Sequence, residues 1–152
     1  MILPTTPPDA DQEALWELQC ELLSLAENLL GPRDSSKRIF LPTFALDGPF
    51  LRNTPQLDGA FAELSLNAAR SWRTAIYELG HETVHLLNPT VMHTNRLEEG
   101  VAVAFSAHAL AHYGCKPHPP KLATYVEALG LVEELRAGRS FLLGLHGKRL
   151  GH

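Results

Sequence analysis

The sequence has little of several features that would each assign it to a class of protein. Its two cysteines, Cys20 and Cys115, are too few for a disulfide framework, and this predicts a reducing, cytoplasmic setting. No apolar run approaches the roughly 18 to 20 residues of a membrane helix, and the first residues lack the pattern of a signal peptide. A protein exported without a signal peptide would have the same composition.

Positive charge is also scarce. Thirteen Lys and Arg against 17 Asp and Glu give a formal net charge of −4, with a pI near 6.0. No basic field is therefore present to attract nucleic acid or anionic lipid, and we expect neither as a partner.

The remaining composition is that of an ordinary folded domain with an excess of histidine. The chain has 152 residues, of which 45% are hydrophobic and 20% charged, so it can bury a core and is not expected to be disordered. Eight histidines are many for this length. We find no internal repeat or composition shift, and residues 1–152 are predicted to form a single domain.

Apolar periodicity predicts a helix near the start of the chain and a small sheet after it. Asp9 or Asp11 can cap the helix, and Gly31-Pro32 ends it. Its expected buried stripe, with alternating spacings of three and four, comprises Leu15, Leu18, Leu22, Leu25 and Leu29. Short β-type runs follow at residues 39–41, 43–46, 50–51 and 61–66 and predict a small antiparallel sheet of two to four strands.

The second half of the chain is predicted to be helical. Capping and stop signals delimit helices at residues 72–87, 97–113 and 121–137, with a short last helix near residues 141–145. The fold class is therefore α+β: a small antiparallel sheet packed on a helical lobe.

His81-Glu82-Thr83-Val84-His85 lies inside the predicted helix 72–87 and is the most informative motif of the chain. Histidines at i and i+4 share one helix face, so their imidazoles can converge on a single Zn²⁺. Glu82 lies one residue round the helix, displaced from the ligand position. It is placed to take a proton from a water molecule on the metal.

A site of this kind needs a third protein ligand and an open fourth position. An acidic pair, Glu98-Glu99, begins the next predicted helix, and either carboxylate can supply the ligand. The other can accept a ring N–H from one of the two histidines. His93 is a further alternative for the third ligand.

The motif followed by Glu98-Glu99-Gly100-Val101-Ala102 resembles the gluzincin branch of the zincin metallopeptidases, over roughly residues 61–112. Alignment on Gly100 implies Glu99 as the third ligand and the motif helix as the centre of a zincin-like fold. The resemblance also implies an oxyanion donor from a more C-terminal element: Tyr125 first, with Tyr113 and His146 as alternatives. The gap to Glu99 is shorter than in the large peptidases, and the chain lacks their extra domains, which makes it a minimal member.

Other candidate ligands are expected to play no part in this site. His108 and His112 form a second i, i+4 pair, but His108 lies about half a turn round the helix from Glu99 and about 13 Å along it. A surface or packing role is predicted for both. Cys115 and His118 have the spacing of a metal pair without further cysteines to complete it. Glu78 lies one turn before Glu82. Its side chain is expected either to contact the metal ligands from outside or to be solvated.

The predicted function is zinc-dependent hydrolysis of peptide bonds, with Glu82 as the general base and a peptide or protein as substrate. The substrate is expected to lie along an edge strand formed by residues 61–66. Two alternatives remain. One is a zincin-fold module that binds a partner without turnover, because 152 residues leave little material for a second cleft wall. The other is a toxin or effector peptidase with a single protein target.

Overall fold

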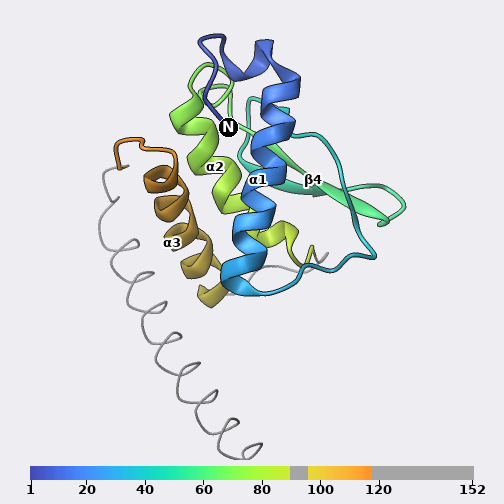
Figure 1. The fold of residues 1–152 in the computed structure, drawn as a ribbon. Coiled ribbons are helices and arrows are strands. Elements are labelled where there is room, and N and C mark those ends of the chain that lie inside the picture. The colour runs from blue at the N-terminus through green and yellow to red at the C-terminus, as the bar shows by residue number, and fades with distance from the viewer. Residues whose placement is uncertain (90–95, 118–152) are drawn as a thin grey trace, which may run out of the picture.

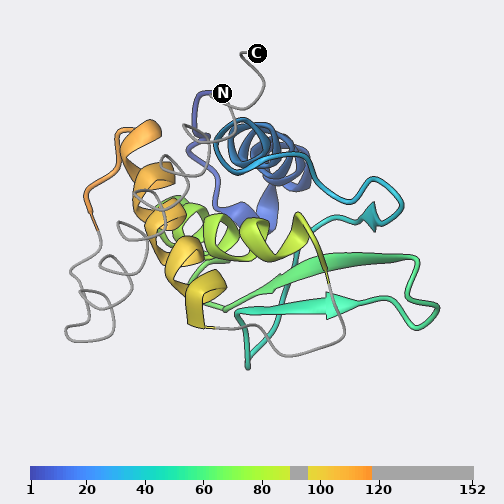
Figure 2. The ribbon, with the colours of Figure 1, turned by 90° about the horizontal axis from the view of Figure 1, so that it is seen from below.

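The computed structural model describes residues 1–89 and 96–117, which form an α+β fold with its helices on one side of a small sheet (Figures 1 and 2). The helices of this part are α1 (Gln12–Leu30), α2 (Trp72–Leu86) and α3 (Arg96–His112), with one 3₁₀ turn at Pro8–Ala10. The predicted helices at 72–87 and 97–113 are thereby confirmed within a residue at each end. Those predicted at 121–137 and 141–145 lie outside the described residues.

The sheet is mixed, with β4 (Gly59–Leu64) in the middle. β3 (Phe50–Asn53) pairs with it antiparallel, and Phe50 lies opposite Glu63. β1 (Arg38–Ile39) and β2 (Thr43–Phe44) both run parallel to β4, along its other edge. The prediction of an antiparallel sheet therefore holds only for the β3–β4 pair. Local alternation predicts a strand, but which partner it finds depends on the route of the connecting chain.

β4 is not an edge strand, contrary to the sequence-based expectation for residues 61–66. Ala60 is paired with Ile39 on one side and with Asn53 on the other. Its backbone is therefore unavailable to an added strand. Within the described part of the chain β3 pairs only with β4, so the free edge on that side of the sheet belongs to β3.

α1 begins and ends as predicted, but its buried face is rotated. The side chain of Asp11 accepts a hydrogen bond from the Ala14 backbone N–H, which settles the capping residue, and Gly31 ends the helix with φ 111°. Leu29 is 49% exposed, and Leu23 is buried in its place. The reason is tertiary, because Leu23 packs against Ala60 of β4 and Leu86 of α2.

α2 is the central element of the fold. Figure 2 shows it between α1 and the sheet, with α3 alongside. The Ser71 side chain caps it by accepting from the Thr74 backbone N–H. Gly80 allows α3 to approach closely, since a Cβ atom there would lie 3.4 Å from the Ala109 Cβ and from the Ser106 Cα. No helix among the described residues is long and apolar enough to cross a bilayer.

Candidate metal centre

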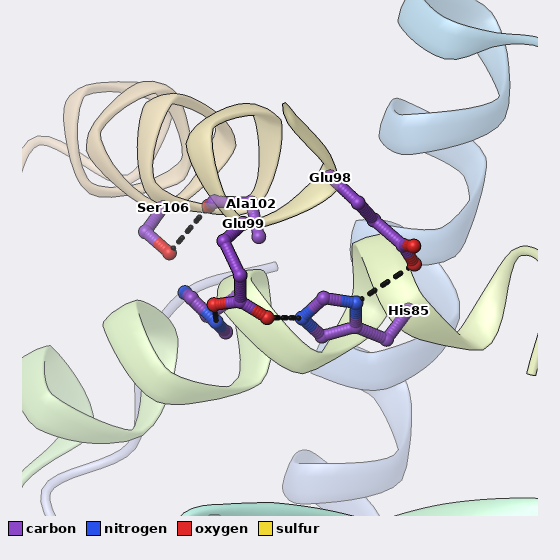
Figure 3. A network of polar contacts seen from close by, with 6 residues as sticks. His85, Glu98, Glu99, Ala102 and Ser106 are labelled. Atoms are coloured by element: carbon purple, nitrogen blue, oxygen red, sulfur yellow. Dashed lines mark hydrogen bonds and ion pairs between the residues drawn. The ribbon is translucent and has the colours of Figure 1, made fainter. Parts of the chain in front are cut away.

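α2 and α3 together bring three of the predicted site residues to one place. His81 and His85 lie one turn apart on α2, and their ring centroids are 5.2 Å apart. Glu99 lies in the first turn of α3 and reaches across to both rings, as Figure 3 shows for His85. One ligand atom from each of the three residues lies within 4.8 Å of the others. The group can therefore hold a metal ion.

The Glu99 carboxylate bridges the two imidazoles. One oxygen lies 3.1 Å from His81 Nε2, and the other lies 3.0 Å from His85 Nε2. Both histidines thus point the same ring nitrogen at one carboxylate. The ring of His85 is 5% exposed, that of His81 is 21% exposed and the Glu99 side chain is 44% exposed. The group is open to solvent on the Glu99 side and closed beneath His85.

Glu98 contacts the opposite side of the His85 ring. Its Oε1 lies 2.9 Å from His85 Nδ1. Figure 3 marks this contact with a dashed line. A carboxylate accepts only, so Nδ1 carries a proton and Nε2 is the nitrogen left to face a metal. The sequence had left open which carboxylate of the pair would accept a ring N–H, and the structure shows that Glu98 contacts Nδ1.

The protonation of His85 in this arrangement follows from its two carboxylate neighbours. Burial by itself lowers the pKa of His85, but the hydrogen bonds to Glu99 and Glu98 outweigh burial and raise the pKa to about 9. Without a metal ion, His85 is therefore an imidazolium held between two glutamates. A metal ion at Nε2 replaces the proton there.

Glu82 lies beside this group but takes no part in it. Its side chain is 5% exposed, and no hydrogen bond or ion pair joins it to another residue in the described part of the chain. Burial raises the pKa of Glu82, which His81 and His85 oppose and which Glu99 and Glu78 reinforce. A buried carboxylate without a protein partner, next to two imidazoles, is placed to exchange a proton with a bound molecule.

Glu78 has a role that neither sequence-based alternative anticipated. Its carboxylate accepts from the Ser65 backbone N–H at 2.9 Å and from the Ser65 hydroxyl at 2.5 Å. It therefore fastens the turn after β4 to α2, one turn of helix before Glu82. The contact spans 13 residues, so no local sequence signal could have shown it.

A second polar contact missed by the sequence lies inside the α1–α2 interface. The Gln19 amide nitrogen donates to the Thr83 hydroxyl at 3.0 Å, and that hydroxyl donates to the Leu79 carbonyl at 2.6 Å. Both side chains are fully buried, and Gln19 Oε1 has no hydrogen-bond partner among the described residues. Because Thr83 lies within the His81–His85 motif, this contact fixes how that part of α2 is rotated against α1.

The remaining candidates lie elsewhere. The Tyr113 hydroxyl donates to Glu21 on α1, and Tyr113 is about 21 Å along α3 from Glu99, so it is not an oxyanion donor of this group. His108 and His112 are exposed and contact Phe105 and Tyr113, in agreement with the predicted surface or packing role. His93, His118, Tyr125 and His146 lie outside the described residues.

Comparison of the chain with protein-family models, with curated proteins and with solved structures finds no match. The group formed by His81, His85 and Glu99 therefore has to be interpreted from its own geometry and chemistry.

Proposed function

We propose that this protein is a zinc-dependent peptidase, in which His81, His85 and Glu99 bind the metal and Glu82 is the general base. The observation that carries the proposal is the convergence of two imidazole nitrogens and one carboxylate within 4.8 Å, with the buried Glu82 beside them. Two histidines and one glutamate are a ligand set of catalytic zinc, whereas structural zinc sites are rich in cysteine.

The spacing between the carboxylate and each imidazole is close to that in a zinc site. Ligands at about 2.0 to 2.1 Å from zinc in a tetrahedral site are about 3.3 Å from one another. The two Glu99 oxygens lie 3.1 and 3.0 Å from the two imidazole nitrogens, one oxygen to each, and the three donors together lie within 4.8 Å, so they would have to draw closer around a single ion. Three protein ligands leave the fourth position for water or substrate, on the side where Glu99 is exposed.

The proposed chemistry divides between the metal and the chain. A zinc ion held by these residues would supply Lewis acidity and would lower the pKa of bound water towards neutrality. Glu82 would take the proton from the attacking water and later deliver it to the leaving amine. Glu98 would hold His85 with Nε2 towards the metal. Tyr125 stays the proposed oxyanion donor and requires its own test.

The observed sheet decides which strand a peptide substrate would pair with. A peptide that adds as a strand would pair with β3, whose outer edge is unpaired in the described part of the chain and which packs against α2, instead of with β4. A protein substrate, with no nucleic acid or membrane involved, is the class that this arrangement favours. Nothing in the described residues favours a toxin or effector role over general proteolysis.

The metal is tested first. Purified protein should contain close to one zinc per chain by elemental analysis, and replacing His81 and His85 together with alanine should abolish it. His108→Ala with His112→Ala is the matched control, because that pair has the same helical spacing and should leave the zinc content unchanged. Zinc retained by the first variant, or lost by the control alone, would overturn the proposal.

Turnover is tested separately with Glu82→Gln. Glu82 lies outside the proposed ligand set, so zinc content and fold should be preserved while cleavage of a mixed peptide library falls by at least about 10³. Wild-type protein that binds zinc but cleaves nothing, alone or with cell extract added, would favour the alternative of a binding module. Equal cleavage by the variant would show that another base is used.

A further inference from the structure

The chain holds the two histidines of the metal group in different ways. The His85 ring is 5% exposed and has a carboxylate at each nitrogen, with Glu98 2.9 Å from Nδ1 and Glu99 3.0 Å from Nε2. Figure 3 shows the ring between these two carboxylates. Because both nitrogens are engaged, the ring cannot turn without breaking a hydrogen bond.

His81 is held at one nitrogen only. Its Nε2 lies 3.1 Å from Glu99, whereas its Nδ1 has no hydrogen-bond partner in the described part of the chain. The side chain is 21% exposed. Gln19 Oε1 is the only buried side-chain nitrogen or oxygen without a partner among the described residues, so the unpartnered Nδ1 of His81 is open to water.

Neighbouring carboxylates on α2 do not supply the missing acceptor. Glu78 lies three residues before His81, but both of its oxygens accept from Ser65. Glu82 follows His81 directly and forms no hydrogen bond with any described residue. The orientation of the His81 ring therefore depends on its contact with Glu99 alone, as far as the described residues are concerned.

We propose that His81 is the mobile ligand of the metal centre, and that its release opens the site to uptake and loss of the metal while His85 stays fixed. The inference rests on the metal site of the proposed function. A partner at the far nitrogen of a ligating imidazole holds the ring in place, and losing that partner typically costs about 10- to 100-fold in metal affinity. His85 has this support from Glu98, and His81 has none among the described residues.

Exposure favours the same side of the group. His81 and Glu99 are 21% and 44% exposed, whereas His85 is 5% exposed, so a chelator or another metal-binding molecule reaches the His81 side first. The activity of the proposed peptidase would then follow the supply of metal. The different support of the two histidines would thus regulate the site.

The first test compares single variants of the whole protein, with zinc affinity measured by competition against a chromogenic chelator. His85→Ala should lose at least about tenfold more affinity than His81→Ala, because it removes the ligand that is already held in place. His108→Ala is the matched control, since it removes an exposed histidine of α3 outside the group and should bind zinc as wild type does. Equal losses in the two test variants would contradict the proposal.

A double-mutant cycle with Glu98→Gln shows whether the difference comes from the partner at Nδ1. In the His81→Ala background, Glu98→Gln should weaken zinc binding by at least about a further tenfold. In the His85→Ala background it should change nothing, because the ring that Glu98 holds is absent. The same loss in both backgrounds would overturn the proposal, since Glu98 would then act without His85.

Ring motion is measured directly by NMR relaxation dispersion on the zinc-loaded wild-type protein, which needs no substitution. The His81 ring should show exchange on the microsecond-to-millisecond timescale, and the His85 ring should not. Equal behaviour of the two rings, or exchange at His85 alone, would refute the assignment of His81 as the mobile ligand. Wild-type protein that binds no zinc would instead refute the metal site of the proposed function, so the two failures are distinguishable.

Discussion

The contact between Glu98 and His85 gives the sharpest test of how the chain tunes a metal. Glu98 Oε1 lies 2.9 Å from Nδ1 of an imidazole that is only 5% exposed, so water cannot replace this acceptor easily. Glu98→Gln keeps the size of the side chain and an acceptor oxygen but removes the charge. Changes to such partners typically cost about 10- to 100-fold in metal affinity. We take about 30-fold for Glu98→Gln, because its side chain can still accept the hydrogen bond but carries no charge.

That loss converts into a measurable shift of stability. Zinc at about 100 times its dissociation constant stabilises the folded state by about 2.7 kcal/mol, which for a chain of this size is about 8 °C in Tm. A 30-fold weaker site at the same zinc concentration gives about 0.9 kcal/mol, or about 3 °C. Glu98→Gln should therefore lose most of the zinc-dependent shift and keep part of it.

The assay is thermal unfolding followed by circular dichroism, with a metal buffer in one arm and a chelator in the other. Glu13→Gln is the matched control, because Glu13 is exposed in the first turn of α1 and should leave the shift unchanged. A wild-type zinc shift in the Glu98→Gln protein would refute the inferred role of Glu98. The absence of any shift in wild-type protein would instead refute zinc binding itself.

Three further predictions follow from the same geometry. Glu99→Gln should reduce zinc affinity more than Glu98→Gln does, measured by competition with a chromogenic chelator, and the reverse order would transfer the ligand role to Glu98. Gly80→Ala should be neutral or slightly stabilising in thermal unfolding because a Cβ just fits, whereas Gly80→Leu should displace α3 and weaken zinc binding. Thr83→Val should cost about 1 to 3 kcal/mol in urea unfolding, since both polar atoms of the buried Gln19 amide would then be unpaired. Gln19→Leu should cost less than Thr83→Val, because it also removes an unpaired oxygen, and equal losses would contradict this account.

Local signals in the sequence were sufficient for the three helices of the described residues. Ser71 was recognisable as a cap and Gly31 as the end of α1, and the cap of α1 was narrowed to Asp9 or Asp11, because each acts on backbone groups within a few residues of itself. The i, i+4 spacing of His81 and His85 placed both rings on one face for the same reason. The acidic pair at the start of α3 was recognisable as the source of a third donor.

Contacts between distant segments were decided by the tertiary structure alone. The parallel pairing of β1 and β2 with β4, and so the loss of β4 as an edge strand, depends on how the chain returns to the sheet. Glu99 contacts both Nε2 atoms and Glu98 contacts Nδ1 because of the way α3 lies across α2. No spacing along the chain encodes this arrangement. Local hydrogen bonds are set by neighbours in sequence, whereas the positions of ligands and pairing edges are set by packing between segments, and only the folded chain fixes those.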